Sequence, residues 1–259
     1  MSSERAEIAA MIAFFTRLPA GLTGISDARL ADVQLARASR FAGLAGALIG
    51  FIGALAIWAL DMVGLPREAA VICGMVVLLV VTGGLHEDGF ADMADSFGAR
   101  TPERRLEIMR DSRVGTYGAV ALWVSLSLRA VLLIAIAKGG GMALLGALIA
   151  AHALSRSAAL YLPYNLPPAR PDGASAAFGR PDWPTFRLGL LIAAVIAAAA
   201  IWLAAGIAAV LLAFVLTAVA AYSMSYIAWT RYGGQTGDLI GAAQQIKEMA
   251  ILAAVAIFV

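Results

Sequence analysis

The stretch LGLLIAAVIAAAAIWLAAGIAAVLLAFVLTAVAAYSMSYIAWT, residues 188–230, contains no charged side chain. A helix that crosses the roughly 30 Å hydrocarbon layer of a membrane needs about 20 apolar residues. This run is long enough for two crossings, and Ala205-Gly206 is the expected turn between them. The rest of the chain agrees, because 61% of its 259 residues are hydrophobic and 14% are charged. In soluble domains, about 45–50% of residues are apolar and about 25% are charged.

Five further apolar runs have the length and composition of membrane-crossing helices. They are residues 41–60, 69–85, 117–137, 142–162 and 239–259. A shorter apolar run, residues 6–15, is too brief to cross alone and is expected to form an interfacial or re-entrant helix. The sequence therefore predicts a single integral membrane domain, residues 1–259, with an all-α fold. It should be a polytopic helix bundle of about seven transmembrane helices.

Positive side chains are unevenly distributed among the polar connections. With the N-terminus in the cytoplasm, the outer loops receive only Arg67 and Lys138, and the cytoplasmic segments receive the other Lys and Arg residues of the connections. Cytoplasmic loops of membrane proteins carry the excess of positive charge. We therefore expect a cytoplasmic N-terminus, with every motif-like polar segment on the cytoplasmic side. The net charge of +2 does not indicate nucleic-acid binding, and no nucleic-acid partner is expected.

The most distinctive polar segment is GGLHEDGFADMAD, residues 83–95. If it is helical, Asp88, Asp92 and Asp95 stand at i, i+4 and i+7 and fall within roughly 60° of one face. Three like charges on one face repel one another unless a cation lies among them. Carboxylate oxygens suit Mg²⁺ or Mn²⁺. The spacing predicts a Mg²⁺ site (Mn²⁺ is the alternative) for phosphoryl transfer, against the simpler interpretation of a polar loop that caps a membrane helix.

Two further ionisable side chains, His86 and Glu87, lie near the start of the same segment. Each can bind, orient or deprotonate a hydroxyl group. Together with the three aspartates they are the candidate catalytic residues. The general base among them is left open.

The segment MRDSRVGTYG, residues 109–118, is a candidate diphosphate clamp. Two arginines can meet phosphate oxygens, and a glycine-flanked helix N-terminus adds backbone donors. Arg110, Asp111, Ser112 and Arg113 are the candidate substrate-binding residues, and Asp111 is a possible further metal ligand. The alternative is a positively charged membrane anchor at a helix entry.

The segment GGQTGD, residues 233–238, is the third candidate. Its glycines favour a ligand pocket, because small residues let a ligand approach the backbone. A flexible hinge is the alternative. The candidate substrate-binding residues here are Gly233, Gly234, Thr236, Gly237 and Asp238, and Asp238 supplies a second carboxylate at the same membrane face.

Ionisable residues inside the predicted spans are costly and are expected to face a polar interior. Arg129, His152 and Arg156 are of this kind, unless they form buried structural pairs or extend to the membrane surface. Glu248 is the fourth, and its alternative is a simple ion pair near the interface, with Lys247 or Arg231 as the partner.

Four motifs in order carry a resemblance to a known family. They are FTRLP at 15–19, GLHEDGFAD at 84–92, MRDSRVGTYG at 109–118 and GGQTGD at 233–238. Together they resemble the cobalamin synthase family, which has adenosylcobinamide-GDP ribazoletransferase activity. The resemblance covers nearly the whole chain, and the two central motifs are its specific part. Relatives commonly have glycine after Asp95, where this chain has Ser96.

The resemblance implies a multi-pass enzyme of the bacterial inner membrane, acting late in cobalamin assembly. It would join adenosylcobinamide-GDP to α-ribazole or its 5′-phosphate and release GMP, with Mg²⁺ stabilising the charge on the departing group. Its partners would be these substrates, the lipid bilayer and other late cobalamin-assembly enzymes.

Two other functions fit parts of the pattern. CDP-alcohol phosphotransferases also use spaced aspartates on membrane helices, but their longer Asp-Gly-Ala-Arg pattern is missing. A transporter would use intramembrane charges along a substrate path. The clustering of the acids at one membrane face disfavours the transporter.

Overall fold

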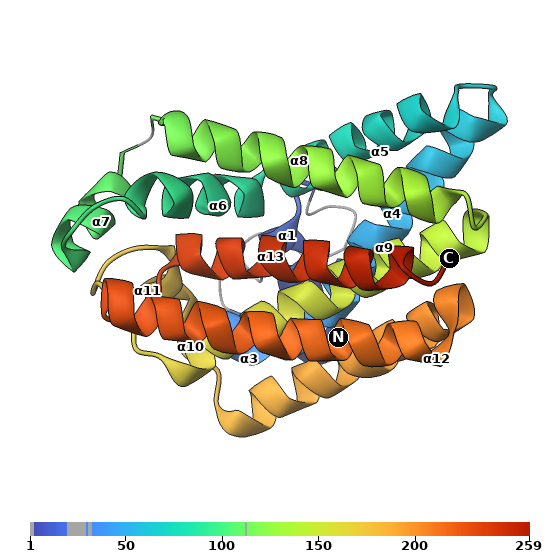
Figure 1. Cartoon of the computed structure of the whole chain (residues 1–259). Coiled ribbons are helices and arrows are strands. Elements are labelled where there is room, and N and C mark those ends of the chain that lie inside the picture. Colours follow the sequence, from blue (N-terminus) through green and yellow to red (C-terminus); the bar gives the residue numbers. More distant parts are fainter. Residues whose placement is uncertain (1–2, 20–29, 31–32, 112) are drawn as a thin grey trace.

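The computed structural model describes residues 3–19, 30, 33–111 and 113–259, and its regular elements are helices (Figure 1). The predicted all-α fold is confirmed. The long helices are α4 (Ala42–Met62), α5 (Arg67–Thr82), α8 (Thr116–Ala137), α9 (Gly141–Ala159), α12 (Trp183–Tyr232) and α13 (Gly237–Ala256). The shorter helices are α1 (Ser3–Phe15), α3 (Leu35–Ala38), η2 (Ser39–Phe41), α6 (Leu85–Ser96), α7 (Pro102–Ile108), α10 (Tyr161–Asn165) and α11 (Ala174–Phe178).

The long helices have the properties of membrane spans. Within the described residues, five helices are long and apolar enough to cross a membrane, or six if α5 and α6 together form one broken span. The longest of the five, α12, has a non-helical residue at Gly206, with φ 82° and ψ 179°. Its two arms meet at this break and form a V, which confirms the turn expected at Ala205-Gly206 (Figure 1). The predicted total of about seven transmembrane helices and the predicted cytoplasmic N-terminus stay predictions.

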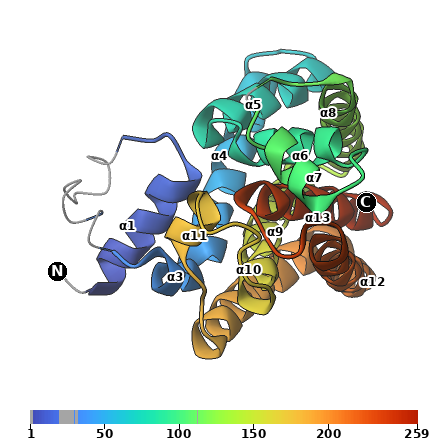
Figure 2. The ribbon, with the colours of Figure 1, turned by 90° about the vertical axis from the view of Figure 1, so that its left-hand side faces the viewer.

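Small residues allow the helices to approach closely around α9, which lies in the middle of the bundle against α4, α12 and α13 (Figure 2). A Cβ at Gly46 of α4 would overlap the carbonyl of His152, and one at Gly50 would overlap the carbonyl of Leu148. Helices in membranes associate through such small-residue contacts. Large apolar side chains cover the outside of the long helices, as expected for contact with lipid, including Trp58, Val80, Trp123, Leu203, Leu211 and Val219.

A sharp bend separates α5 from the acidic helix α6. The two helices are bent by 90°, and the connection is Gly83-Gly84, with φ of 67° and 66°. Positive φ values are easily adopted by glycine alone, so this pair allows the bend. The apolar run that was predicted to continue straight to residue 85 therefore ends as a helix at Thr82.

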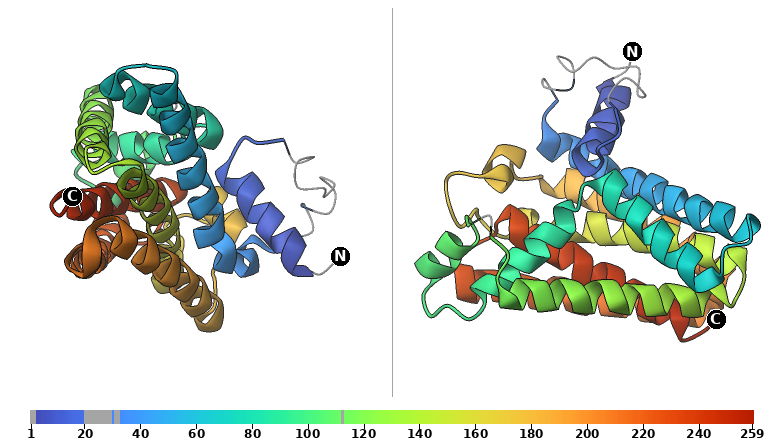
Figure 3. Two further views of the ribbon diagram at one scale, coloured as in Figure 1. Left: turned by 90° about the vertical axis from the view of Figure 1, so that its right-hand side faces the viewer. Right: turned by 90° about the horizontal axis from the view of Figure 1, so that it is seen from above.

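The polar segments gather at one end of the bundle. Helices α6, α7 and α11 lie at the left end in Figure 1, and the α4–α5 and α8–α9 connections lie at the other end. Helix α1 projects from the side of the bundle and packs against α3 and the start of α4 (Figure 3). Because α6 is polar and is not one of the five apolar helices, we treat it as lying outside the membrane-spanning segments.

Candidate active site

The acidic segment is helical, which is the condition on which its i, i+4, i+7 spacing was interpreted. Asp88, Asp92 and Asp95 lie along α6, which packs against α13 and α8. The contact with α13 is a backbone contact, since a Cβ at Gly89 would lie 2.8 Å from the Cα of Asp238. This close approach brings the carboxylate of Asp238 on α13 to the acidic face of α6. Two of the candidate segments therefore form one site.

The carboxylates at this site are crowded. Partial burial, and then the neighbouring charges of Asp88, Asp238 and Asp95, raise the pKa of Asp92 to about 7, and Arg170 opposes the rise. Each nearby negative charge disfavours ionisation of the next carboxyl group. A bound cation would relieve this repulsion. The site therefore offers several oxygen atoms that can bind a metal ion, and its carboxylates outnumber its positive side chains.

Asp95 has a different environment from the other acids. Its carboxylate accepts hydrogen bonds from the backbone N–H groups of Gly115 (2.7 Å) and Gly118 (2.8 Å), at the N-terminus of α8. Negative groups stabilise helix N-termini in this way. The structure therefore supports a structural role for Asp95, and the geometry does not favour the predicted role as a metal ligand.

The oxygen ligands at this site fit Mg²⁺ only together with a substrate. Among the described residues, no three Asp, Glu, His or Cys side chains converge closely enough to hold a metal ion by themselves. Mg²⁺ is usually held by one or two carboxylates together with substrate phosphates. Asp88 and Asp238, which lie on either side of the α6–α13 contact, fit that simpler requirement.

Arg170 is a site residue that the sequence did not reveal. Its Nη2 lies 3.6 Å from Oδ2 of Asp238, and its Nη1 is buried without a hydrogen-bond partner among the described residues. The residue belongs to the proline-rich loop between α10 and α11 and carries no motif. A donor without a partner beside a cluster of acids is suited to an anionic ligand.

The predicted diphosphate clamp is exposed and internally paired. Arg110 donates to both carboxylate oxygens of Asp172 at 2.8 Å, and Arg113 lies 2.6 Å from Asp111. Ser112 lies outside the described residues. The clamp stays a prediction, and a phosphate would have to displace these carboxylates from the arginines.

The segment 233–238 packs against neighbouring parts of the chain. Gly233 ends α12 with φ 74°, and Gly234 leaves room for the carbonyl of Pro167, which would lie 2.5 Å from a Cβ. The hydroxyl of Thr236 accepts a hydrogen bond from the backbone N–H of Leu239 and caps α13. These contacts oppose the hinge interpretation and give Gly233, Gly234 and Thr236 structural roles. Gly237 and Asp238, by contrast, line a cavity.

The N-terminal motif contacts the start of the acidic segment. The ring of Phe15 stacks on His86 at 5.7 Å between centroids, and Arg17 packs where Gly83 has no side chain. The N–H of Arg17 also donates to the carbonyl of Val81. Segments far apart in sequence are therefore assembled around α6.

The comparisons with known proteins decide the family. The sequence matches the family described as cobalamin-5-phosphate synthase over residues 7–256. The chain belongs to this family. A relative from Azorhizobium caulinodans is 42% identical over 254 residues, covering 98% of this chain and 96% of the relative. One from Brucella ovis is 39% identical, covering 93% and 92%. Both are named adenosylcobinamide-GDP ribazoletransferase.

Membership of the cobalamin-5-phosphate synthase family confirms the resemblance that the four motifs carry. It shows a transferase of cobalamin biosynthesis and does not support the transporter or CDP-alcohol alternatives. No solved structure matches the chain.

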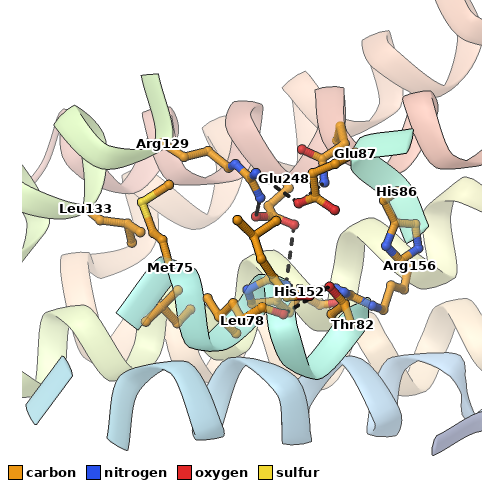
Figure 4. Close-up of a pocket in the computed structure, with 13 residues that line it drawn as sticks. Met75, Leu78, Thr82, His86, Glu87, Arg129, Leu133, His152, Arg156 and Glu248 are labelled. Carbon is orange, nitrogen blue, oxygen red and sulfur yellow. Dashed lines mark hydrogen bonds and ion pairs between the residues drawn. The ribbon is translucent and has the colours of Figure 1, made fainter. Parts of the chain in front are cut away.

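This member of the cobalamin-5-phosphate synthase family has a buried charge network beside its acidic helix (Figure 4). Arg129 of α8 contacts Glu248 of α13 at 3.1 Å and Glu87 of α6 at 2.9 Å. His152 of α9 lies 3.4 Å from Glu248. Arg129, His152 and Arg156 therefore pair inside the bundle, which agrees with the alternative of buried structural pairs. Of the two alternative partners of Glu248, Lys247 does not pair with it and instead donates to the carbonyl of Ala243.

The network has a structural character. Arg156 donates to Nδ1 of His152 at 2.8 Å, and the network encloses a cavity of about 20 Å³. A cavity of that size has room for about one water molecule. Glu87 is engaged by Arg129 and Gln245, away from the aspartates. The geometry therefore does not favour Glu87 as the general base.

Proposed function

We propose that this chain joins adenosylcobinamide-GDP to α-ribazole, or to its 5′-phosphate, and releases GMP. The observation that carries the proposal is the family match over residues 7–256. The relatives' shared name supplies the substrates. The meeting of α6 and α13 supplies a suitable place, with carboxylates from both helices beside an arginine.

The reaction is a phosphoryl-group transfer. A ribose hydroxyl of the ribazole attacks the phosphorus that carries the cobinamide arm, and a new phosphorus–oxygen bond forms. The bond from that phosphorus to the oxygen of the GMP phosphate breaks, and GMP leaves with its electron pair. The hydroxyl proton must pass to a base. Positioning and charge neutralisation provide most of the catalysis in such transfers.

Asp92 is the base that its electrostatic environment favours. A carboxylate with a pKa of about 7 accepts a proton efficiently near neutral pH. His86 is packed against Phe15 and is 4% exposed, so it is less accessible to a hydroxyl group. Glu87 is held by Arg129. Of the candidate residues, we therefore propose Asp92 as the base.

Asp88 and Asp238 would hold Mg²⁺, with Mn²⁺ as the alternative. When bound, the ion supplies positive charge that stabilises the departing phosphate. Arg170 lies beside this pair, and its guanidinium would donate to a substrate phosphate oxygen. Arg110 and Arg113 remain candidates for guiding the diphosphate toward the site, because they are exposed at the same end of the bundle.

We place the site at the cytoplasmic face of a bacterial inner membrane, where nucleotide substrates are available. The support is the charge distribution, since the segments at the polar end carry most of the arginines of the connections. Other late cobalamin-assembly enzymes would meet the protein at that face.

The direct test of the activity uses the full chain in lipid nanodiscs with adenosylcobinamide-GDP, α-ribazole 5′-phosphate and Mg²⁺. Mass spectrometry should find the joined corrinoid and GMP in equal amounts. The same assay with unphosphorylated α-ribazole measures the substrate preference. Folded protein that forms neither product from either ribazole would refute the proposed function.

A further inference from the structure

A second cavity, of about 120 Å³, opens directly beside the acidic site. It lies where the end of α1, the start of α6, the end of α9, α11 and the start of α13 meet, and α1 and α11 are neighbours in Figure 2. A water molecule needs roughly 10–15 Å³ measured in the same way. The cavity therefore has room for a group of ring size.

Aromatic side chains form one wall of this cavity. Phe14 and Phe15 of α1 and Phe178 of α11 line it. The rings of Phe14 and Phe178 are 5.2 Å apart between centroids, so they tie α11 to α1. The faces and edges of these phenylalanine rings favour contact with a flat aromatic ligand.

The carboxylates of Asp88 and Asp238 lie at the exposed side of the cavity, since Asp88 is exposed and Asp238 is half-buried. Asp88 and Asp238 both line it, so a group bound among the rings has its outer end at the acidic site. At the inner end, the guanidinium of Arg156 lies 5.7 Å from the centre of the Phe15 ring. Arg156 is 2% exposed, and its Nε has no hydrogen-bond partner among the described residues.

We propose that this aromatic cavity binds the base of the ribazole substrate and thereby selects the acceptor. This inference rests on the proposed function and extends it to one substrate's subsite. With the base among the rings, the attached ribose lies at the mouth, where its hydroxyl group faces the aspartates. A near-attack arrangement of this kind accelerates a two-substrate reaction.

The competing occupant is the guanine of the donor. Guanine carries a carbonyl group and an amino group on its edge, and burying them without hydrogen-bond partners is unfavourable. The walls are mostly apolar, and the hydroxyl of Ser175 already donates to Gln235 at 2.6 Å. A base with few polar edge groups therefore fits this cavity better than guanine.

The test compares two phenylalanines of equal burial. Phe178 lines the cavity, whereas Phe186 stacks on Tyr164 in a separate aromatic cluster, and both are 6% exposed. Phe178→Leu should raise the KM for α-ribazole roughly fivefold or more, the loss expected for one stacking contact. The KM for adenosylcobinamide-GDP should stay unchanged. Phe186→Leu should leave the KM for both substrates near the wild-type value.

A second variant fills the cavity from its rim. Ala174 of α11 is exposed and lines the cavity, so Ala174→Trp should block it without disturbing the core. Equilibrium binding of labelled α-ribazole to the full chain in nanodiscs, without donor, should be lost. Unchanged α-ribazole binding in Ala174→Trp would overturn the proposal, even if Phe178→Leu fails to fold.

The outcomes separate this proposal from the proposed function. If wild-type protein binds α-ribazole, Ala174→Trp abolishes that binding and no GMP forms, the subsite stands and the activity does not. If GMP forms but Phe178→Leu raises the KM of adenosylcobinamide-GDP alone, the cavity holds guanine. In that case the activity stands and the subsite proposal is wrong.

Discussion

The backbone N–H of Gly118 donates a 2.8 Å hydrogen bond to the carboxylate of Asp95, although the two residues belong to different helices. A second bond comes from Gly115 at 2.7 Å. A side chain at Gly118 would overlap the carboxylate, so the glycine is required for the approach. The last aspartate of the acidic helix therefore fixes the start of α8 relative to α6.

Asp95→Ala should destabilise the protein, because two N–H groups at the start of α8 lose their charged acceptor. The expected loss is about 2 kcal/mol. Thermal unfolding in detergent should show a lower Tm than that of the wild type. Asp92→Asn is the matched control and should unfold at the same temperature or higher, since it removes a crowded charge. An Asp95→Ala protein with wild-type Tm but weakened metal binding would instead make Asp95 a ligand.

Gly89→Ala should impair turnover through the contact between α6 and α13. Its Cβ would lie 2.8 Å from both the Cα and the carbonyl oxygen of Asp238, and backbone atoms cannot move aside cheaply. Displacing a catalytic group by about 1 Å can lower the rate on the order of 10²-fold. Gly98→Ala is the control, because its Cβ would meet no atom within 4 Å. Equal rates for the two variants would show that this close contact is not needed.

The rate should fall on the acidic side of neutral pH. Burial and the neighbouring carboxylates raise the pKa of Asp92 to about 7, so the base is protonated below that pH. The kcat/KM should then fall about tenfold for each pH unit. A bound cation favours the ionised carboxylate, so the midpoint should move to lower pH as Mg²⁺ is raised. A midpoint that does not respond to Mg²⁺ would contradict the shared site.

Arg170→Gln should weaken binding of the diphosphate substrate. The loss of a charge-assisted hydrogen bond to phosphate should raise the KM for adenosylcobinamide-GDP roughly tenfold or more. The KM for α-ribazole should change little. Arg187→Gln is the control, because Arg187 is an exposed arginine near the start of α12. A rise confined to α-ribazole would place the diphosphate elsewhere.

The sequence predicts the helices well, because the local signals are strong. Long uncharged runs define the apolar helices, and the interruption at Gly206 is where composition places it. The acidic segment is helical, so Asp88, Asp92 and Asp95 do have the i, i+4, i+7 relationship on which the predicted site depends. The 90° bend was missed at Gly83-Gly84, although adjacent glycines are a turn signal and this is the one such pair inside the predicted apolar runs.

The partners of the site residues depend on tertiary structure. Lys247 or Arg231 was the alternative partner for Glu248, but adjacent residues on a helix such as Lys247 and Glu248 point in different directions. Arg129 of α8 reaches Glu248 instead. The bonds of Asp95 to α8 and the position of Arg170 likewise follow from how distant segments pack. Spacing along one helix identifies which residues share a face, and it does not identify what packs against that face.

The most direct test of the central claim measures GMP release by the full chain in nanodiscs with both substrates. The wild type should form GMP and the joined corrinoid in equal amounts, and chelation of Mg²⁺ should stop both. Asp92→Asn should insert and unfold like the wild type but release GMP at least about 10²-fold more slowly, as expected for loss of a general base. Asp92→Asn turnover near the wild-type rate, or turnover that survives chelation, would contradict a catalytic site built from the carboxylates of α6 and α13.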